Sequence, residues 1–306
     1  MPHIEANGLQ IEVEQHGDPS QPTVLLVMGL ATQLVHWPQE FIAELVDGGH
    51  HVVTFDNRDI GLSEKLEGHN APPPGASLLT SALGLGWLLA PYDLRDMAGD
   101  TVGVLDALDI NDAHIVGVSM GGMIAQVLAA RYPERIRSLT TIMSSTNRRS
   151  LPRTDREIVR AIISARSNRL SHDEQVERSL GVWRMISTQD GGRDIEEMRQ
   201  LISDSTARCN YPEGVRRQIA AIVASGDLRK WTRRITAPTY VVHGKADRLT
   251  PYQGSVDIAA TVRDARLDLI EGMGHDLPPR FLPQVTASIL EHLRTTDENT
   301  AASKAA

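Results

Sequence analysis

Gly117-Val118-Ser119-Met120-Gly121 separates two segments of different character. The run before it, Ala113-His114-Ile115-Val116, is typical of a buried strand, and residues 122–130 have the pattern of a helix. The flanking glycines lack a Cβ atom, so the chain can turn sharply between the two. A strand, a sharp turn with a serine and a helix form a nucleophile elbow, which presents the serine hydroxyl to a cleft. We therefore predict that Ser119 is a nucleophile, although G-x-S-x-G also occurs in ordinary turns.

A histidine near the C-terminal end is the predicted general base. His275 follows the strand-like residues 266–270 and lies in the glycine-rich turn Gly272-Met273-Gly274-His275. Such a turn lets an imidazole ring reach inward, whereas the alternative is a histidine that only caps its own loop. The other histidines considered lie mostly in strand-like or exposed segments: His36, His50, His51, His69, His114 and His243. The position of His275 fits the chain order serine, acid, histidine, and we expect it to remove the proton from Ser119.

Asp247 is the predicted acidic partner of this histidine. It follows the apolar strand-like residues 239–243 and a short turn. A carboxylate there holds the imidazole in one tautomer and stabilises its charged form. Asp257 and Asp276 are competitors, but Asp257 falls in a helical pattern, and Asp276 is adjacent to His275, where covalent geometry hinders pairing. An Asp in a turn can also serve only its own backbone.

Two backbone N–H groups are expected to stabilise the negative charge of a tetrahedral intermediate. One belongs to Met120, directly after the predicted nucleophile. The other belongs to Leu30, after the strand-like residues 23–28, with Gly29 permitting the turn. The structural alternative is that Gly29 only ends a buried strand. The expected pocket residues are uncharged and near these loops in the sequence, although such residues also fill cores: Gly29, Trp37, Met143 and Met273.

Apolar strand-like segments alternate with helical segments over residues 1–146 and again over residues 237–294. The predicted strands are 9–16, 23–28, 51–55, 113–118, 138–143, 238–243 and 266–270. Buried strands joined through helices indicate an α/β fold, with a mostly parallel central sheet and helices on both faces. Over residues 147–236 the strand signal vanishes and apolar residues recur at helical spacing, which predicts an inserted helical module. Residues 295–306 are polar and alanine-rich and are expected to form a disordered tail.

Residues 71–92 form an unusual segment that begins with prolines and then turns apolar. We favour a short helix packed on the body of the protein, because large apolar patches are rarely left exposed. The alternatives are that Trp87, Leu88 and Leu89 line the entrance of the site, or that they contact a lipid or a partner.

Charge and composition bear on the classes of partner that we expect. The 306 residues carry a formal net charge of −8, which gives no reason to expect nucleic acid or an anionic membrane as a partner. Cys209 is the single cysteine, so no intramolecular disulfide can form.

No secretory signal is visible, and no uncharged apolar run reaches the length of a membrane span, about 18 residues, so a cytoplasmic location is expected. No metal-ligand cluster is evident, and neither a metal nor a cofactor is expected; the oligomeric state is left open.

The order of elbow serine, acid and histidine resembles that of the α/β-hydrolase superfamily. Asp56-Asn57-Arg58-Asp59-Ile60-Gly61-Leu62-Ser63 is similar to the D-x-R-x-x-G-x-S segment of that superfamily. Residues 27–29, 36–38 and 272–278 resemble a bacterial serine carboxylesterase subgroup that includes aclacinomycin methylesterase-like proteins.

The resemblance covers about residues 8–146 and 237–294 and implies an α/β-hydrolase fold in which residues 147–236 form a cap over the active site. It also implies a carboxylesterase that cleaves a small or medium ester, its small-molecule partner, through an acyl-enzyme. Acyltransferases and perhydrolases similar to cofactor-free haloperoxidases use the same triad and are an alternative. A ligand receptor without catalysis is a third hypothesis, against which the complete set of Ser119, Asp247 and His275 argues.

Overall fold

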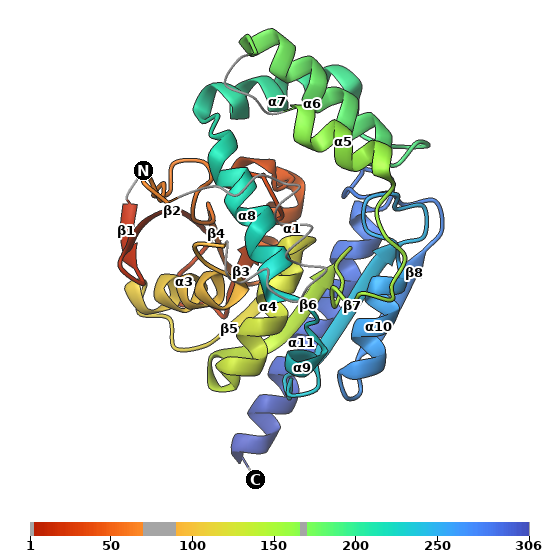
Figure 1. Cartoon of the computed structure of the whole chain (residues 1–306). Coiled ribbons are helices and arrows are strands. Elements are labelled where there is room, and N and C mark those ends of the chain that lie inside the picture. Colours follow the sequence, from red (N-terminus) through yellow and green to blue (C-terminus); the bar gives the residue numbers. More distant parts are fainter. Residues whose placement is uncertain (1–2, 70–89, 166–169, 306) are drawn as a thin grey trace.

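The apolar strand-like segments of the sequence form strands. The computed structural model describes residues 3–69, 90–165 and 170–305 (Figure 1). The strands are β1 (His3–Ala6), β2 (Leu9–His16), β3 (Thr23–Val27), β4 (His51–Phe55), β5 (Ala113–Val118), β6 (Ile136–Ile142), β7 (Thr239–Gly244) and β8 (Arg266–Ile270). Every residue of β3, β4 and β7 is buried, as expected for strands covered on both faces.

One sheet contains all of these strands. The described residues form an eight-stranded sheet in the order β1-β2-β4-β3-β5-β6-β7-β8. β1 pairs with β2 and β2 pairs with β4 in antiparallel fashion, and the other neighbours are parallel. The predicted mostly parallel sheet is therefore confirmed, with β1 as an edge strand that the sequence patterns did not predict.

Helices cover both faces of the sheet. On one face lie α1 (Gln39–Asp47) and α11 (Leu282–Ala305). On the other face lie α3 (Leu94–Ala107), α4 (Met120–Arg131) and α10 (Gln253–Thr261). Phe41 and Val285 belong to the buried cluster of the first face, and Met97 and Ile258 to that of the second. The sheet thus has no solvent-facing side at its centre.

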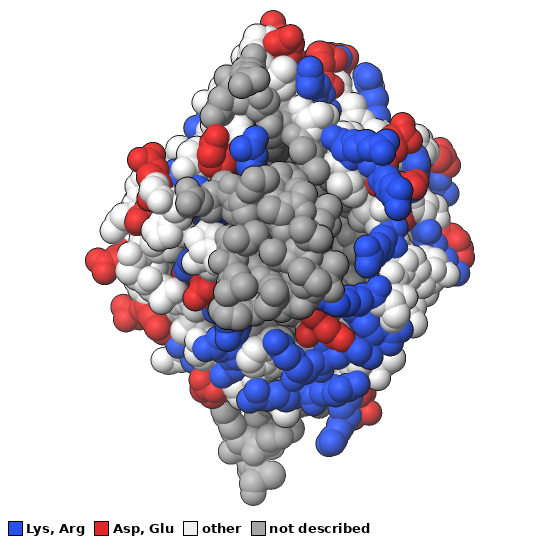
Figure 2. Space-filling view, in the orientation of Figure 1, with Lys and Arg blue, Asp and Glu red and all other residues white. Residues whose placement is uncertain are grey.

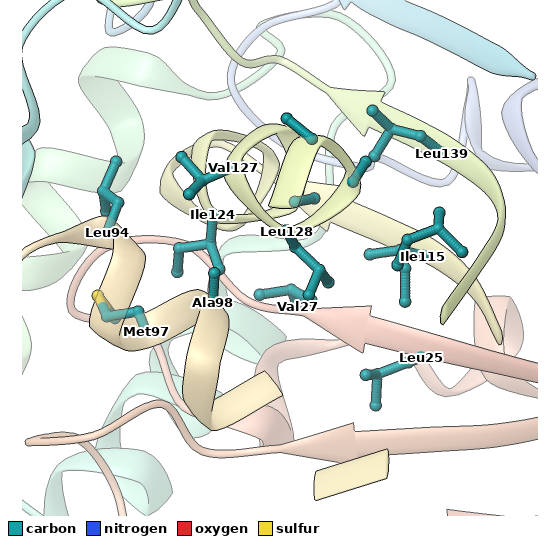
Figure 3. Close-up of a cluster of buried hydrophobic side chains, with 14 of the residues drawn as sticks. Leu25, Val27, Leu94, Met97, Ala98, Ile115, Ile124, Val127, Leu128 and Leu139 are labelled. Carbon is teal, nitrogen blue, oxygen red and sulfur yellow. The ribbon is translucent and has the colours of Figure 1, made fainter. Parts of the chain in front are cut away.

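Helix α4 is enclosed by apolar neighbours. Figure 3 shows Ile124 and Leu128 of α4 beside Val27 of β3 and Ala98 of α3. Ten of the twelve α4 residues are buried. Close packing on all sides fixes the axis of the helix, and so fixes the turn at its N-terminal end. That turn contains Ser119.

The inserted helices predicted between two sheet strands are present. They follow β6 and precede β7, and they are α5 (Arg156–Ala165), α6 (His172–Ile186), α7 (Ile195–Arg208), α8 (Pro212–Ser225) and α9 (Arg229–Thr232). In Figure 1, α5, α6 and α7 stand together apart from the sheet, and α8 runs back towards it. Local signals explain where they begin: Ser171 and Glu174 form a capping box at α6, and Asp194 caps α7.

The C-terminal segment differs from the expectation. Helix α11 continues to Ala305, so residues 295–305 are helical rather than disordered. Thr296 is buried, and Asp297 contacts His114 and Arg137 at 3.2 Å each, which holds this part of the helix against the sheet. Of the proline-rich segment 71–92, residues up to 89 lie outside the described part of the chain. None of the described helices has the length and apolar character needed to cross a membrane.

Candidate active site

Ser119 occupies a strained turn between β5 and α4. Its backbone has φ 54° and ψ −118°, on the side of conformational space that residues other than glycine rarely adopt. Its N–H donates to the Ile142 carbonyl at 2.9 Å, and its own carbonyl accepts from the Ser144 hydroxyl at 2.8 Å. Such strain persists only where the surroundings hold it, and it is concentrated at functional sites. The structure therefore places Ser119 as the elbow motif predicts.

Glycines make this turn possible because side chains would collide there. A Cβ atom on Gly117 would lie 2.4 Å from the Gly121 carbonyl oxygen, and one on Gly121 would lie 2.0 Å from that of Val27. A Cβ atom on Gly29 would lie 3.2 Å from Cβ of Ser119. The loop after β3 can therefore approach the serine closely.

The His275 ring and the Asp247 carboxyl group form a direct hydrogen bond. Nδ1 of His275 lies 2.6 Å from Oδ2 of Asp247, and the carboxyl group is fully shielded from solvent. Oδ1 of Asp247 accepts from the N–H groups of Leu249 and Thr250, each at 2.8 Å. An ionised carboxylate requires a proton on Nδ1 and leaves Nε2 to accept a proton.

A second histidine, not predicted from the sequence, shares the same carboxylate. Nε2 of His243 lies 3.0 Å from Oδ2 of Asp247 and 2.8 Å from the Thr250 carbonyl oxygen. Since both of these neighbours accept hydrogen bonds, Nε2 carries the proton, and Nδ1 accepts from the Ser255 hydroxyl at 2.7 Å. Burial of the Asp247 carboxyl opposes its ionisation, but the nearby His275 charge and the hydrogen bonds of both histidines lower its pKa to about 2. The only sequence signal for His243 is its position at a strand end, four residues before Asp247.

The two competing acids serve other partners. Oδ1 of Asp276 accepts from the backbone N–H and the hydroxyl of Thr188, at 2.9 and 2.7 Å. Asp257 accepts from the Thr146 hydroxyl at 2.5 Å and pairs with Arg148 at 3.0 Å. Of the three candidate acids, Asp247 is therefore the one that the structure brings to the His275 ring.

The loop after β3 is held by a helix of the insertion. The Ala31 N–H donates to the side-chain oxygen of Gln218 at 3.0 Å, and the Gln218 amide nitrogen donates to the Arg58 carbonyl at 3.0 Å. Gln218 belongs to α8 and is fully buried. The neighbouring residue Leu30 lines the same cavity as Met120, so both predicted N–H donors belong to residues at this site.

A cavity of about 1750 Å³ brings these loops and the inserted helices together. Ser119 and His275 both line it, together with three of the four predicted pocket residues: Gly29, Trp37 and Met143. Met273 is instead fully buried in the core, and its carbonyl accepts from the Ala246 N–H. Among the described residues no hydrogen bond joins the Ser119 hydroxyl to the His275 ring, and such bonds are often long before substrate binds.

One group of side chains has the composition of a metal site. Within the described part of the chain, His50, His114 and Asp297 place ligand atoms within 4.8 Å of one another. The Asp297 oxygen that contacts His114 also accepts from Arg137 at 3.2 Å. A guanidinium bound to the same oxygen would repel a metal ion. These side chains therefore fit a hydrogen-bonded cluster that holds α11 better than they fit a metal site.

Comparisons with known proteins identify the family to which the chain is similar. A family model of the alpha/beta hydrolase fold matches residues 22–278. Rhodomycin D methylesterase DauP from Streptomyces sp. (strain C5) is 27% identical over 297 residues, covering 91% of this chain and 93% of that protein. The putative carbamate hydrolase RutD from Variovorax paradoxus (strain S110) is 28% identical, covering 87% of this chain and 90% of that protein.

Solved structures show the same fold. The enol-lactonase from Burkholderia xenovorans LB400 has a TM-score of 0.73 at 22% identity, covering 96% of this chain and 100% of that one. The esterase EaEST from Exiguobacterium antarcticum has a TM-score of 0.72 at 19% identity, covering 95% of this chain and 98% of that one. Because the family model spans most of the sequence and the fold agrees, this chain belongs to the alpha/beta hydrolase family.

Proposed function

We propose that this protein is a serine carboxylesterase with Ser119 as nucleophile, His275 as general base and Asp247 as the orienting acid. The 2.6 Å bond between His275 and Asp247, in the cavity that Ser119 also lines, carries the proposal. Similarity to rhodomycin D methylesterases over most of both chains supports an ester rather than another hydrolase substrate.

The proposed reaction has two halves. Nε2 of His275 takes the hydroxyl proton of Ser119, and Oγ attacks the ester carbonyl. The resulting oxyanion accepts hydrogen bonds from the N–H groups of Leu30 and Met120. The imidazolium then gives its proton to the leaving alcohol, and an acyl-enzyme remains. Water, activated by His275, attacks this acyl-enzyme and releases the carboxylic acid and the free serine.

We also propose that residues 147–236 act as a cap, with residues 1–146 and 237–294 as the catalytic core. Side chains of α5, α6 and α7 line the cavity together with Ser119: Arg160, Trp183 and Met198 are examples. A roof over the serine limits access of water and shapes the pocket for the alcohol and acyl groups.

Replacement of the nucleophile tests the function. We expect Ser119→Ala to lower turnover of p-nitrophenyl butyrate by at least about 10⁴-fold, because the acyl-enzyme can no longer form. Ser179→Ala is the matched control, since Ser179 lines the same cavity on α6, and it should keep most of the activity. A fluorophosphonate probe should label the wild type and the control, but not Ser119→Ala.

Undiminished turnover by Ser119→Ala would reject the assignment of the nucleophile. Product analysis in the presence of alcohols and hydrogen peroxide separates hydrolysis from the alternatives. The carboxylic acid should be the main product, whereas a transferase or perhydrolase would form the new ester or the peracid.

A further inference from the structure

Arginines gather on one side of the cavity that holds Ser119. Residues 148–160 contain five arginines and two acids. The two acids, Asp155 and Glu157, are outside the cavity lining, and all five arginines belong to it: Arg148, Arg149, Arg153, Arg156 and Arg160. Figure 2 shows Lys and Arg side chains over α5 and the segment that leads into it. This positive charge is local, because the chain as a whole has a net charge of −8.

Two of the cavity arginines are already neutralised by acids. Arg148 pairs with Asp257 at 3.0 Å, and the Asp257 side chain is largely buried on α10. Arg193 lies 3.9 Å from both Glu40 and Glu197, which line the cavity as well. These two arginines therefore have structural partners.

Three other arginines of the cavity have no acidic partner among the described residues. Arg153, Arg156 and Arg160 are exposed and form no ion pair with another residue in the described part of the chain. Arg156 and Arg160 are four residues apart on α5, so they lie on the same side of that helix. A guanidinium fork matches the geometry of a carboxylate, and it is the side chain of choice where a planar anion is bound.

The cavity is large enough to hold a second substrate group far from the serine. Its volume of about 1750 Å³ exceeds the roughly 300–1,000 Å³ of ordinary small-molecule pockets. Around Ser119 the lining is apolar, with Met120, Met143 and Ile186 among its members, and the unpaired arginines come from α5 and the residues before it. The cavity therefore suits a molecule with an apolar body and an anionic end.

We propose that the preferred substrate is an ester of an apolar acid that carries a free carboxylate at its far end, bound by Arg153, Arg156 and Arg160. This proposal rests on the proposed esterase function and names the substrate class of that site. The carboxylate takes no part in bond breaking; it fixes the orientation of the acyl chain, so that the ester carbonyl lies at Ser119. Attraction between unlike charges also concentrates such a substrate at the cavity.

Paired substrates test the proposal. One series consists of p-nitrophenyl monoesters of straight-chain dicarboxylic acids from adipic to sebacic acid, and the other has a methyl ester in place of each free carboxylate. For at least one chain length, the wild type should have a kcat/KM about tenfold higher for the carboxylate, since one charge-assisted hydrogen bond contributes on that order. The preference should fall as the sodium chloride concentration rises, because salt screens exposed charges.

A charge-matched pair of variants identifies the arginines. The triple variant Arg153→Gln/Arg156→Gln/Arg160→Gln should lose most of this preference, chiefly through a higher KM for the carboxylate series. The control Arg131→Gln/Arg233→Gln/Arg263→Gln removes the same charge from exposed residues outside the cavity lining, and it should keep the preference. Labelling by a fluorophosphonate checks that each variant retains a folded site.

The outcomes separate this proposal from the one on which it rests. Equal kcat/KM for both series at every chain length, or a preference that survives in the triple cavity variant, would overturn the carboxylate proposal and leave the esterase function standing. No turnover of either series, together with no probe labelling, would overturn the esterase function and the carboxylate proposal with it.

Discussion

Asp247 shows how a single buried carboxylate organises the site. Its Oδ2 accepts from His275 and His243, and its Oδ1 accepts from the N–H groups of Leu249 and Thr250. These donors stabilise the charged form, and the pKa of about 2 keeps the carboxylate ionised at the pH of any esterase assay. The proton on Nδ1 of His275 is therefore fixed, and Nε2 is the nitrogen that exchanges protons with Ser119 in the proposed mechanism.

The lowered pKa of Asp247 predicts a specific acid sensitivity. Its folded-state pKa of about 2 is below the usual aspartate pKa of 3.8, which it regains on unfolding. The stabilising contribution of this carboxylate is therefore complete above the unfolded pKa and is lost as the pH falls towards the folded pKa. From about pH 5 to about pH 3, we expect the wild type to lose about 1 kcal/mol more free energy of unfolding than Asp247→Asn. Urea unfolding at both pH values measures this difference.

The matched control for this prediction is Asp204→Asn, which makes the same change on the exposed face of α7. It should follow the wild-type pH dependence. If Asp247→Asn also follows it, the carboxyl is not held in its charged form by the two histidines.

Gln218 is a positioning residue for the loop that carries the proposed Leu30 donor. Its side chain joins the Ala31 N–H to the Arg58 carbonyl, both at 3.0 Å. Gln218→Met keeps the size of the side chain and removes both hydrogen bonds, so the loop is free to shift. We expect kcat for p-nitrophenyl butyrate to fall by about 10- to 100-fold with little change in KM, because the oxyanion exists only along the reaction path.

Gln200→Met provides the comparison, since it makes the same replacement at an exposed position of α7. Its kcat should be that of the wild type. A higher KM in Gln218→Met, with kcat unchanged, would contradict a role of Gln218 in positioning the oxyanion donor.

At the scale of elements, the inserted helices hold two loops of the core, the loop of the proposed base His275 and the loop of the proposed oxyanion donor Leu30. Directly after α6, Thr188 accepts from the Gly274 N–H at 2.9 Å, and the Ile186 carbonyl accepts from the His275 N–H at 2.7 Å. On the other side, the Gln33 amide donates to two carbonyl groups at the end of α7. The insertion therefore does more than cover the cavity, because the backbone around the proposed base and the oxyanion loop is bonded to it.

Thr188 provides a test of this connection. Its hydroxyl lies between the Gly274 N–H and the Asp276 carboxylate, and burial raises the pKa of Asp276 while Thr188 lowers it. Thr188→Val keeps the shape of the side chain, but the buried Gly274 N–H loses its acceptor and Asp276 keeps only the hydrogen bond from the Thr188 backbone N–H. This loss should cost about 1–3 kcal/mol of unfolding free energy and lower kcat. Thr188→Ser keeps the hydroxyl and should therefore keep the wild-type stability and kcat. Equal stability and kcat in the two variants would show that the hydroxyl does not hold the His275 loop.

Local patterns predicted the proposed triad, but not the contacts that support it. Ser119 and His275 stand in glycine-rich turns after apolar strands, and Asp247 follows a strand in the same way, so each is marked by its immediate neighbours. Gln218 reaches Ala31 across 187 positions of the sequence, and nothing near Gln218 indicates that contact. Met273 shows the same limit, because its neighbours in the chain suggest a pocket residue and the packing of the sheet buries it.

For the whole molecule, a buried ion pair joins the insertion to the core. Arg217 of α8 donates to both carboxylate oxygens of Asp59, at 2.8 and 2.6 Å, and both side chains are shielded from water. Tyr92 donates to the same carboxylate at 2.8 Å. Although burial opposes the charge, the bonds from Arg217 keep the pKa of Asp59 below its usual value.

The overall architecture was predictable because it follows from repeated patterns, whereas the ends of the chain were not. Alternation of apolar strands with helices is visible along most of the sequence and identifies a parallel sheet without knowledge of any single contact. The polar residues 295–305 lack such a pattern, and their helix is held by Thr296 and by Asp297 with its partners on β5 and β6. Contacts with segments far away in the sequence decide whether such polar residues form an ordered helix.

The buried pair between Arg217 and Asp59 leads to a prediction about the stability of the molecule. Arg217→Met leaves a buried carboxylate without its cation and should lower the free energy of unfolding by about 3–5 kcal/mol. Asp59→Asn added to it removes the orphaned charge and suits the backbone, since asparagine tolerates the φ of 69° at this position. The double variant should therefore be more stable than Arg217→Met alone, as measured by urea unfolding. Arg294→Met, which removes an exposed pair with Glu298, should change stability by less than about 1 kcal/mol. A double variant no more stable than Arg217→Met would show that the uncompensated charge is not what destabilises the single variant.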